Sequence, residues 1–415
     1  MSFLRRQVVV AALTANAIRP LPGFRGGVFS FFPGWLTSEL APHVLALTAA
    51  DTAVHARGGR RERSTAGMVL AGASMLGLGF LIDQARRVRT EVEDALTEAL
   101  GYDYVEQLDQ KPTPADLAVP WRRLVYPFRI RDAGVTVQKD LPYAPEHGKR
   151  GLLDVYTPAN GVPEGGAPVL LQVHGGGWTI GNKDQQGLPL MNHLASKGWV
   201  CVAINYRLAP RDPFPAQIID VKRAIAWIHE HIADFGGDPD YIAITGGSAG
   251  GHLCALAAVT PNDAAYQPGF EDADTSVQVA VPHYGVYDFA GSTGLRSAEL
   301  MRDTFLAPRV LRKRWADAPE EFEAASPVLR ITKEAPDFFV LHGTHDGLVE
   351  VEQARLFVQR LRDEGGASVV YAELPGAQHA FDVFPSIRSS HVVRAIDRYL
   401  HWHWNRYRNE RSAAR

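Results

Sequence analysis

The chain has 415 residues, of which 46% are hydrophobic and 21% are charged, and its formal net charge is −3. One hydrophobic core rarely grows to this length, so we expect a main domain with an appended segment. The weakly negative charge provides no basic surface for nucleic acid, which leaves a small molecule or a lipid as the expected partner. The two cysteines, Cys201 and Cys254, lie in apolar stretches and match neither a disulfide framework nor a metal-ligand spacing.

Residues 1–120 are predicted to form a helical extension with two long apolar stretches, 26–50 and 66–82. The second stretch has 17 residues without a charge, close to the minimum for crossing a bilayer. Arginines lie on both sides of it, so the positive-inside rule gives no orientation. Three interpretations are open: a membrane-spanning segment, a helical pair lying on the bilayer, and a water-soluble cap over a catalytic domain. The expected location is therefore the membrane or cell envelope, with the cytoplasm as the alternative.

The pattern changes after a proline-rich linker at 110–120, and residues 121–415 are predicted to form an α/β catalytic domain. Two strands, 134–143 and 150–158, are joined by a short turn. Six further apolar runs rich in valine and isoleucine follow, separated mostly by helix-like stretches such as 215–235, whose apolar residues are three and four apart. Apolar strands that alternate with amphipathic helices indicate a mostly parallel central sheet flanked by helices.

The stretch "YIAITGGSAGGHLCALA", residues 241–257, places Ser248 at a turn between a strand and a helix. Gly246 and Gly250 complete the pattern G-x-S-x-G in the strand-turn-helix context that gives this motif its meaning. The sharp turn strains the backbone at its apex and requires neighbours without side chains. It also exposes the hydroxyl at the carboxyl end of the sheet, where α/β proteins bind ligands. Ser248 is therefore the predicted nucleophile, with a phosphate-binding glycine loop as the alternative.

Three successive glycines follow His174 directly after an apolar strand, in "VLLQVHGGGWTIGN". Such a run lets backbone N–H groups turn toward one point, as an oxyanion site requires. The predicted donors are the N–H groups of Gly175, Gly176 and Ala249. The alternative is a plain glycine-rich turn or a dinucleotide loop, and the spacing does not fit the latter.

A serine nucleophile needs a base, and the base needs an anion that fixes its tautomer. For this fold the expected chain order is serine, acid, histidine, each at the carboxyl end of a strand. Asp346 and His379 follow two successive strands and fit this order. Glu350 is the alternative acid, and His252, four residues after the serine, is expected to pack in the helix.

Five motifs, "HGGGW", "NYRLAPRDPFPA", "GGSAGG", "HGTHDGLV" and "GAQHAF", occur in this order between residues 135 and 405. The chain thereby resembles the hormone-sensitive-lipase-like group of α/β-hydrolase-fold carboxylesterases, and more narrowly actinobacterial carboxylesterases and lipases with an N-terminal extension. The resemblance implies ester hydrolysis with neither metal nor organic cofactor, by the triad and oxyanion residues named above. Two positions depart from the family: Arg211 and Asp212 stand where a glutamate is frequent, and Gly347 stands where a proline often follows the aspartate.

The expected function is that of a serine esterase that hydrolyses short- to medium-chain esters, small-molecule or lipid, through an acyl-enzyme. Trp178 and Ile180 are expected to line the substrate entrance, and residues 286–306 with the N-terminal helices could supply a lid. Two alternatives are an arylformamidase-type amide hydrolase and a non-catalytic, membrane-attached interaction protein on a hydrolase scaffold. The sequence does not fix an oligomeric state.

Overall fold

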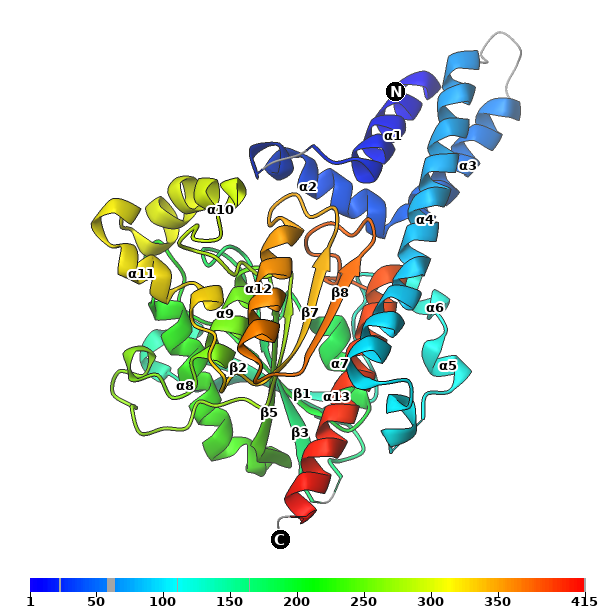
Figure 1. Ribbon diagram of the computed structural model, residues 1–415. Coiled ribbons are helices and arrows are strands. Elements are labelled where there is room, and N and C mark those ends of the chain that lie inside the picture. The colour runs from blue at the N-terminus through cyan, green and yellow to red at the C-terminus, as the bar shows by residue number, and fades with distance from the viewer. Residues whose placement is uncertain (22–23, 58–63, 110, 164, 414–415) are drawn as a thin grey trace.

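A single twisted sheet forms the centre of the computed structural model, which describes residues 1–21, 24–57, 64–109, 111–163 and 165–413. Its strand order is β1-β2-β4-β3-β5-β6-β7-β8 (Figure 1). Strand β2 is antiparallel to both of its neighbours, and β3 to β8 run parallel, which confirms the predicted mostly parallel sheet. The strands are β1 (Val135–Pro142), β2 (Leu152–Pro158), β3 (Ala167–Val173), β4 (Val200–Ile204), β5 (Gly237–Gly247), β6 (Val279–His283), β7 (Asp337–Gly343) and β8 (Val369–Leu374).

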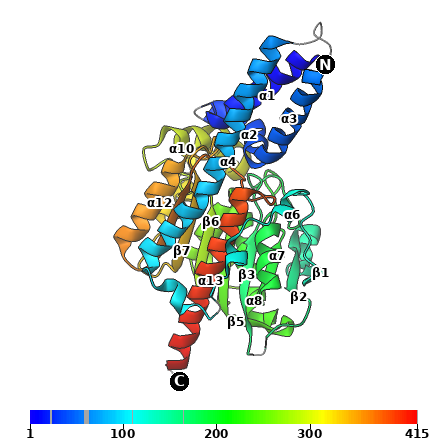
Figure 2. The same cartoon turned by 90° about the vertical axis from the view of Figure 1, so that its right-hand side faces the viewer.

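Helices cover both faces of this sheet because its strands are apolar on both sides, and every residue of β3 is buried. Helices α8 (Ala216–His231), α9 (Ala249–Val259) and α12 (Val351–Glu364) pack on one face. Helices α4 (Thr65–Leu100), α7 (Leu188–Ser196) and α13 (Ile387–Ala413) pack on the other (Figure 2). This arrangement is the predicted α/β-hydrolase fold.

The remaining helices belong to the N-terminal extension and to the connections above the sheet (Figure 1). Helices α1 and α3 pack against the first half of α4 around Leu78 and Leu81, and this group projects away from the sheet. These elements are α1 (Phe3–Ile18), α2 (Phe24–Glu39), α3 (Ala41–Arg57), α5 (Pro114–Leu117), α6 (Trp121–Leu124), α10 (Arg296–Met301) and α11 (Pro319–Ala324).

Helix α4 connects the extension to the catalytic domain. Its second half places Val88, Val92 and Leu96 in the same apolar core as the sheet, at 0–1% exposure. Among the described residues, α4 is the helix that is long and apolar enough to cross a membrane. Within its most apolar 18-residue window, 28% of the residues are buried. The domain boundary expected at residue 120 stays a prediction. Helix α4 lies before this boundary in the chain, but its second half belongs to the core of the sheet.

A buried ion pair attaches the end of α2 to the start of α13. The Arg388 guanidinium bonds the Glu39 carboxylate, and both side chains are fully buried. The same guanidinium donates to the Ser38 hydroxyl and to the Pro375 carbonyl, each at 3.2 Å, and the Ser386 hydroxyl donates to Glu39 at 2.6 Å. A buried charge that loses its partner is strongly destabilising, so this contact ties the extension to the core.

We expect the Arg388→Leu substitution to lower the free energy of unfolding by about 3–5 kcal/mol, because it leaves Glu39 charged and buried. Urea denaturation followed by tryptophan fluorescence measures this loss. Arg355 pairs with Glu373 at the surface and its side chain is 49% exposed, so Arg355→Leu is the matched control and should cost at most about 1 kcal/mol. Equal losses in the two variants would contradict the anchoring role.

Candidate active site

Ser248 occupies the sharp turn between β5 and α9. Its backbone has φ 59° and ψ −121°, a conformation that costs free energy for any residue except glycine. The turn touches the end of β3: a β-carbon on Gly250 would lie 2.1 Å from the Val173 carbonyl oxygen, and one on Gly246 would lie 2.5 Å from it. Ser248 is itself partly exposed between buried neighbours. The glycines therefore permit a contact that holds one reachable hydroxyl above the sheet.

A carboxylate and an imidazole are bonded to one another at the ends of β7 and β8. The Nδ1 atom of His379 lies 2.7 Å from Oδ2 of Asp346, and Oδ1 of Asp346 accepts the N–H groups of Leu348 and Val349, each at 2.9 Å. The aspartate side chain is fully buried. Burial alone would raise the pKa of Asp346, but the attraction of His379 and hydrogen bonds from His342 and His379 hold it well below its usual range. The carboxylate is thus ionised and fixes the proton on Nδ1, which leaves Nε2 of His379 as the basic nitrogen.

Glu350, the alternative acid, and His252, the histidine nearest the serine in sequence, lie in other contacts. Glu350 accepts a hydrogen bond from the Ser297 hydroxyl at 2.6 Å, on the lid-like stretch. His252 is fully buried, and its Nδ1 atom accepts the indole N–H of Trp178 at 3.1 Å. Burial lowers the pKa of His252 to about 3, so this ring stays neutral in the core. The structure therefore joins Asp346, and not Glu350, to His379.

The glycine loop after β3 differs in one respect from the sequence prediction. The N–H of Gly175 donates to Oε1 of Gln186 at 2.7 Å, so the prediction of Gly175 as a free oxyanion donor is wrong. The N–H groups of Gly176 and Gly177 donate to no acceptor within the described part of the chain, and their φ angles are 120° and 57°. Ala249 begins α9, where an N–H has no partner within the helix. The N–H groups that remain as candidate donors are those of Gly176, Gly177 and Ala249.

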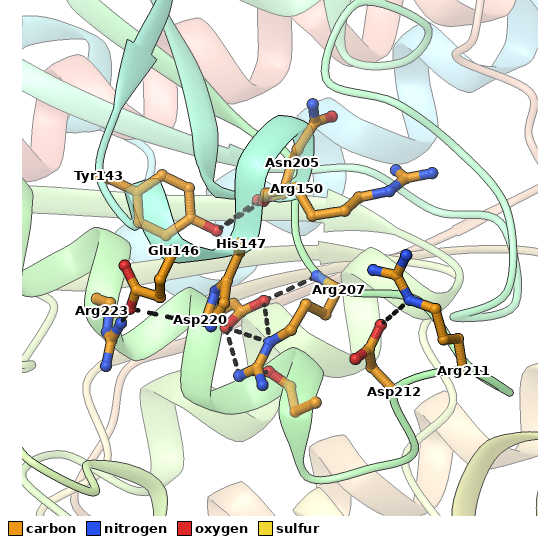
Figure 3. A network of polar contacts seen from close by, with 11 residues as sticks. Tyr143, Glu146, His147, Arg150, Asn205, Arg207, Arg211, Asp212, Asp220 and Arg223 are labelled. Atoms are coloured by element: carbon orange, nitrogen blue, oxygen red, sulfur yellow. Dashed lines mark hydrogen bonds and ion pairs between the residues drawn. The ribbon is translucent and has the colours of Figure 1, made fainter.

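Polar contacts behind this loop hold it in place. The Arg150 guanidinium donates to the Gly181 carbonyl at 2.9 Å, and the Tyr206 hydroxyl donates to the His174 carbonyl at 2.8 Å. Figure 3 shows the neighbouring network, in which Arg207 binds Asp220 with two nitrogens at 2.7 and 3.0 Å. The Tyr206 bond joins the segment after β4 to the loop after β3, and the Arg150 bond joins the segment before β2 to the same loop, so both restrict where the loop N–H groups point.

The first departure from the family, Arg211 followed by Asp212, forms an ion pair between neighbouring residues at 2.8 Å (Figure 3). The Arg211 side chain is 77% exposed, and this pair lies at the edge of the network. This position therefore does not place a buried acid where the family often has its glutamate.

The two residues expected to line the entrance lie in different environments. Trp178 is 2% exposed, donates to His252 and packs edge-on against Phe289 with ring centroids 4.9 Å apart. This placement corrects the expectation, because Trp178 belongs to the core. Ile180 is 68% exposed, and its contact with substrate stays a prediction. The lid-like stretch reaches the glycine loop through Phe305, whose ring lies 3.1 Å from the β-carbon position of Gly177.

Helix α2 of the extension lies directly against the acid and the base. The Phe31 ring stands edge-on to the His379 ring, with centroids 5.8 Å apart and an angle of 81°. A β-carbon on Gly347 would lie 3.0 Å from the Cα atom of Gly27, so backbone meets backbone here. This contact gives a physical reason for glycine where the family often has proline. Sequence reasoning missed Phe31, although the dense aromatic run "FSFFPGW" was a signal that could have indicated it.

The parallel sheet, the strained serine turn and the buried carboxylate–imidazole pair together define an α/β-hydrolase. Comparison with known proteins agrees. The BD-FAE family matches residues 153–361. A probable carboxylic ester hydrolase, LipM of Mycobacterium tuberculosis (strain ATCC 25618 / H37Rv), is 44% identical over 402 residues, which cover 94% of this chain and 91% of LipM. Esterase LipQ of the same organism is 52% identical over 63% of this chain and 61% of LipQ.

Solved structures of esterases share the fold. The apo form of Thermogutta terrifontis esterase 2 is 25% identical, with a TM-score of 0.52 over 64% of this chain and 92% of that chain. Inhibited esterase B from Lactobacillus rhamnosis superposes with a TM-score of 0.55 over 79% of this chain and 99% of that chain, at 18% identity. The chain belongs to the BD-FAE family, with the M. tuberculosis carboxylic ester hydrolases as its relatives. The LipM match covers most of the N-terminal helices as well.

We expect Gly250→Ala to destabilise the protein by at least about 2 kcal/mol and to lower esterase activity, because its β-carbon would meet backbone that cannot move aside. The matched control is Gly79→Ala on the exposed side of α4, where no atom lies within 4 Å of the added carbon. That substitution should raise stability by about 0.5–1 kcal/mol, because alanine favours the helix. Thermal and urea denaturation compare the two variants, and a neutral effect at Gly250 would contradict the packing argument.

Proposed function

We propose that Ser248, His379 and Asp346 form the catalytic triad of a serine carboxylesterase. The observation that carries this proposal is the 2.7 Å bond between His379 and buried Asp346, at the same end of the sheet as the strained serine turn. Nε2 of His379 takes the Ser248 proton as the serine oxygen attacks the ester carbonyl. His379 then gives this proton to the leaving alkoxide, and an acyl-enzyme forms.

The charge that develops on the carbonyl oxygen is stabilised by the N–H groups of Gly176, Gly177 and Ala249. Water enters after the alcohol leaves, and His379 removes a proton from it as it attacks the acyl-enzyme. His379 returns this proton to the serine oxygen as the tetrahedral intermediate collapses, which releases the carboxylic acid and regenerates the serine. This scheme uses only side chains and backbone of the chain itself.

The proposed substrates are esters with a short to medium acyl chain. Aromatic rings lead from the base to the surface: Phe31 stacks on Trp35 at 5.8 Å, and Trp35 contacts Phe384 at 5.4 Å. Phe128 also contacts Phe384, with ring centroids 5.1 Å apart, and is 70% exposed. An apolar part of the substrate would be desolvated along these rings. The relatives' names, carboxylic ester hydrolase and esterase, support an ester substrate over the amide alternative.

A second part of the proposal concerns the bilayer. Residues 1–82 contain eight arginines against three acidic residues, a formal charge of +5, and the other 333 residues carry −8. Three exposed side chains of α4, Val69, Leu76 and Phe80, are spaced by seven and four residues and so share one stripe. Phe29 in α2 is 81% exposed. Apolar stripes beside arginines are typical of surfaces that bind anionic membranes, so residues 26–82 are proposed to contact one.

We expect Ser248→Ala to lower kcat on p-nitrophenyl butyrate by at least about 10⁴-fold, because the nucleophile is lost. A fluorophosphonate probe should label the wild-type protein and fail to label this variant. Ser196→Ala, which removes an exposed hydroxyl on α7, is the control and should keep wild-type activity. Substantial turnover by Ser248→Ala would defeat the triad assignment, and a series of p-nitrophenyl esters from acetate to palmitate measures the chain-length range.

We expect the full-length protein to sediment with vesicles that contain phosphatidylglycerol, and to do so less at high salt because arginine contacts are screened. Leu76→Glu should weaken sedimentation about fivefold or more, because it places a charge in the apolar stripe. Leu329→Glu changes a leucine that is 45% exposed in the catalytic domain and serves as the control. Wild-type protein that stays in the supernatant would contradict membrane contact.

A further inference from the structure

A second histidine–carboxylate pair lies beside the proposed triad. Nδ1 of His283, the last residue of β6, lies 2.6 Å from Oδ2 of Asp382. The hydroxyl of Tyr284 donates to Oδ1 of the same carboxylate. The side chains of His283 and Asp382 are 5% and 15% exposed. Asp382 follows His379 by three residues, so this carboxylate attaches the loop of the proposed base to the end of β6.

The segment His283-Tyr284 contacts the nucleophile turn, the strand that leads to the acid, and the proposed base. The His283 carbonyl accepts the N–H of Ser248 at 3.0 Å, which fixes the nucleophile turn. The Tyr284 N–H donates to the Leu341 carbonyl in β7 at 2.8 Å, on the strand that leads to Asp346. The Tyr284 ring lies against the His379 ring, with centroids 4.6 Å apart and an angle of 56°. Two bonded residues therefore join the nucleophile, the acid strand and the base.

Backbone strain gathers at the same place. Ser248, Tyr284 and Ala380 have φ angles of 59°, 37° and 61°, in a region that residues other than glycine rarely adopt. Such conformations persist only where surrounding bonds hold them. Burial alone would raise the pKa of Asp382, but His283 and the bond from Tyr284 hold it below its usual range, so the carboxylate is ionised and accepts both bonds strongly. A β-carbon on Gly247 would lie 2.5 Å from the Tyr284 oxygen, which shows how closely the hydroxyl approaches the serine turn.

An imidazole bonded through one nitrogen can still rotate about that bond. The 2.7 Å contact with Asp346 holds Nδ1 of His379 but does not set the tilt of the ring. Tyr284 meets one face of the ring, and its own position is set by the bond to Asp382. Because a displacement of about 1 Å in a reacting group can cost about 10²-fold in rate, the tilt affects proton transfer with Ser248.

We propose that Asp382 and Tyr284 are positioning residues that hold His379 in line with Ser248 through acylation and deacylation. The inference rests on the proposed triad, and it adds two residues that act through the base. It predicts a loss that falls on kcat and not on KM, because the misplaced group is needed in the transition state while the substrate contacts are unchanged.

The test compares Asp382→Asn and Tyr284→Phe with a matched control in the full-length protein. Asp397→Asn removes another buried carboxylate, which lies on α13 and bonds His193 at 3.0 Å and Lys197 at 2.8 Å, away from the triad. Measurements are kcat and KM on p-nitrophenyl butyrate and the rate constant for fluorophosphonate labelling, at a temperature where circular dichroism shows each variant folded. Tyr284→Phe keeps the ring and loses only the hydroxyl, so it tests the bond even where Asp382→Asn fails to fold.

We expect Asp382→Asn to lower kcat and the labelling rate by about 10- to 100-fold and Tyr284→Phe by about 3- to 10-fold, with KM within threefold of wild type. Asp397→Asn should stay within twofold in all three. Folded variants at Asp382 and Tyr284 with kcat within twofold of wild type, or with a raised KM alone, would overturn the inference. Ser248→Ala is measured in parallel: if it keeps turnover, the proposed function fails, whereas an inactive Ser248→Ala beside fully active Asp382→Asn refutes the positioning role alone.

Discussion

The close packing around the Ser248 turn is the constraint on which the rest of the site depends. The end of β3, the start of α9 and the end of β6 meet there with no room for a side chain at Gly246, Gly250 or Gly251. This packing holds a strained serine at a fixed height above the sheet. The glycine loop, the proposed acid and the proposed base follow β3, β7 and β8, and they lie at the same edge as the turn because parallel strands all end there.

The N-terminal helices are part of the site and not an addition to a finished enzyme. Helix α2 places Phe31 against His379 and its backbone against Gly347. The buried pair of Glu39 and Arg388 holds the end of α2, and the second half of α4 completes one face of the core. Helix α2, which contacts the proposed base, is therefore held by the same core as the sheet. The proposed membrane contact of these helices would bring the proposed entrance close to a bilayer.

Two hydrogen-bonded carboxylates flank the proposed base and do different work. Asp346 bonds the imidazole itself and fixes its tautomer, whereas Asp382 bonds Tyr284 and His283 and acts on the loop and ring around it. One histidine loop is thus fixed to β7 through its nitrogen and to β6 through its neighbours. Such double attachment suits a group that must exchange a proton with two partners without moving far.

The sequence alone determined the sheet and the family, because apolar strands that alternate with helices and short glycine motifs are local patterns. It also predicted Ser248, Asp346 and His379 as the proposed triad, because each follows a strand whose end is predictable. Other features needed the tertiary structure. The occupied N–H of Gly175 depends on Gln186, the burial of Trp178 depends on His252 and Phe289, and Phe31 reaches His379 across more than 340 residues of chain. Such contacts join segments that share no local pattern, so only the packing of the folded chain decides them.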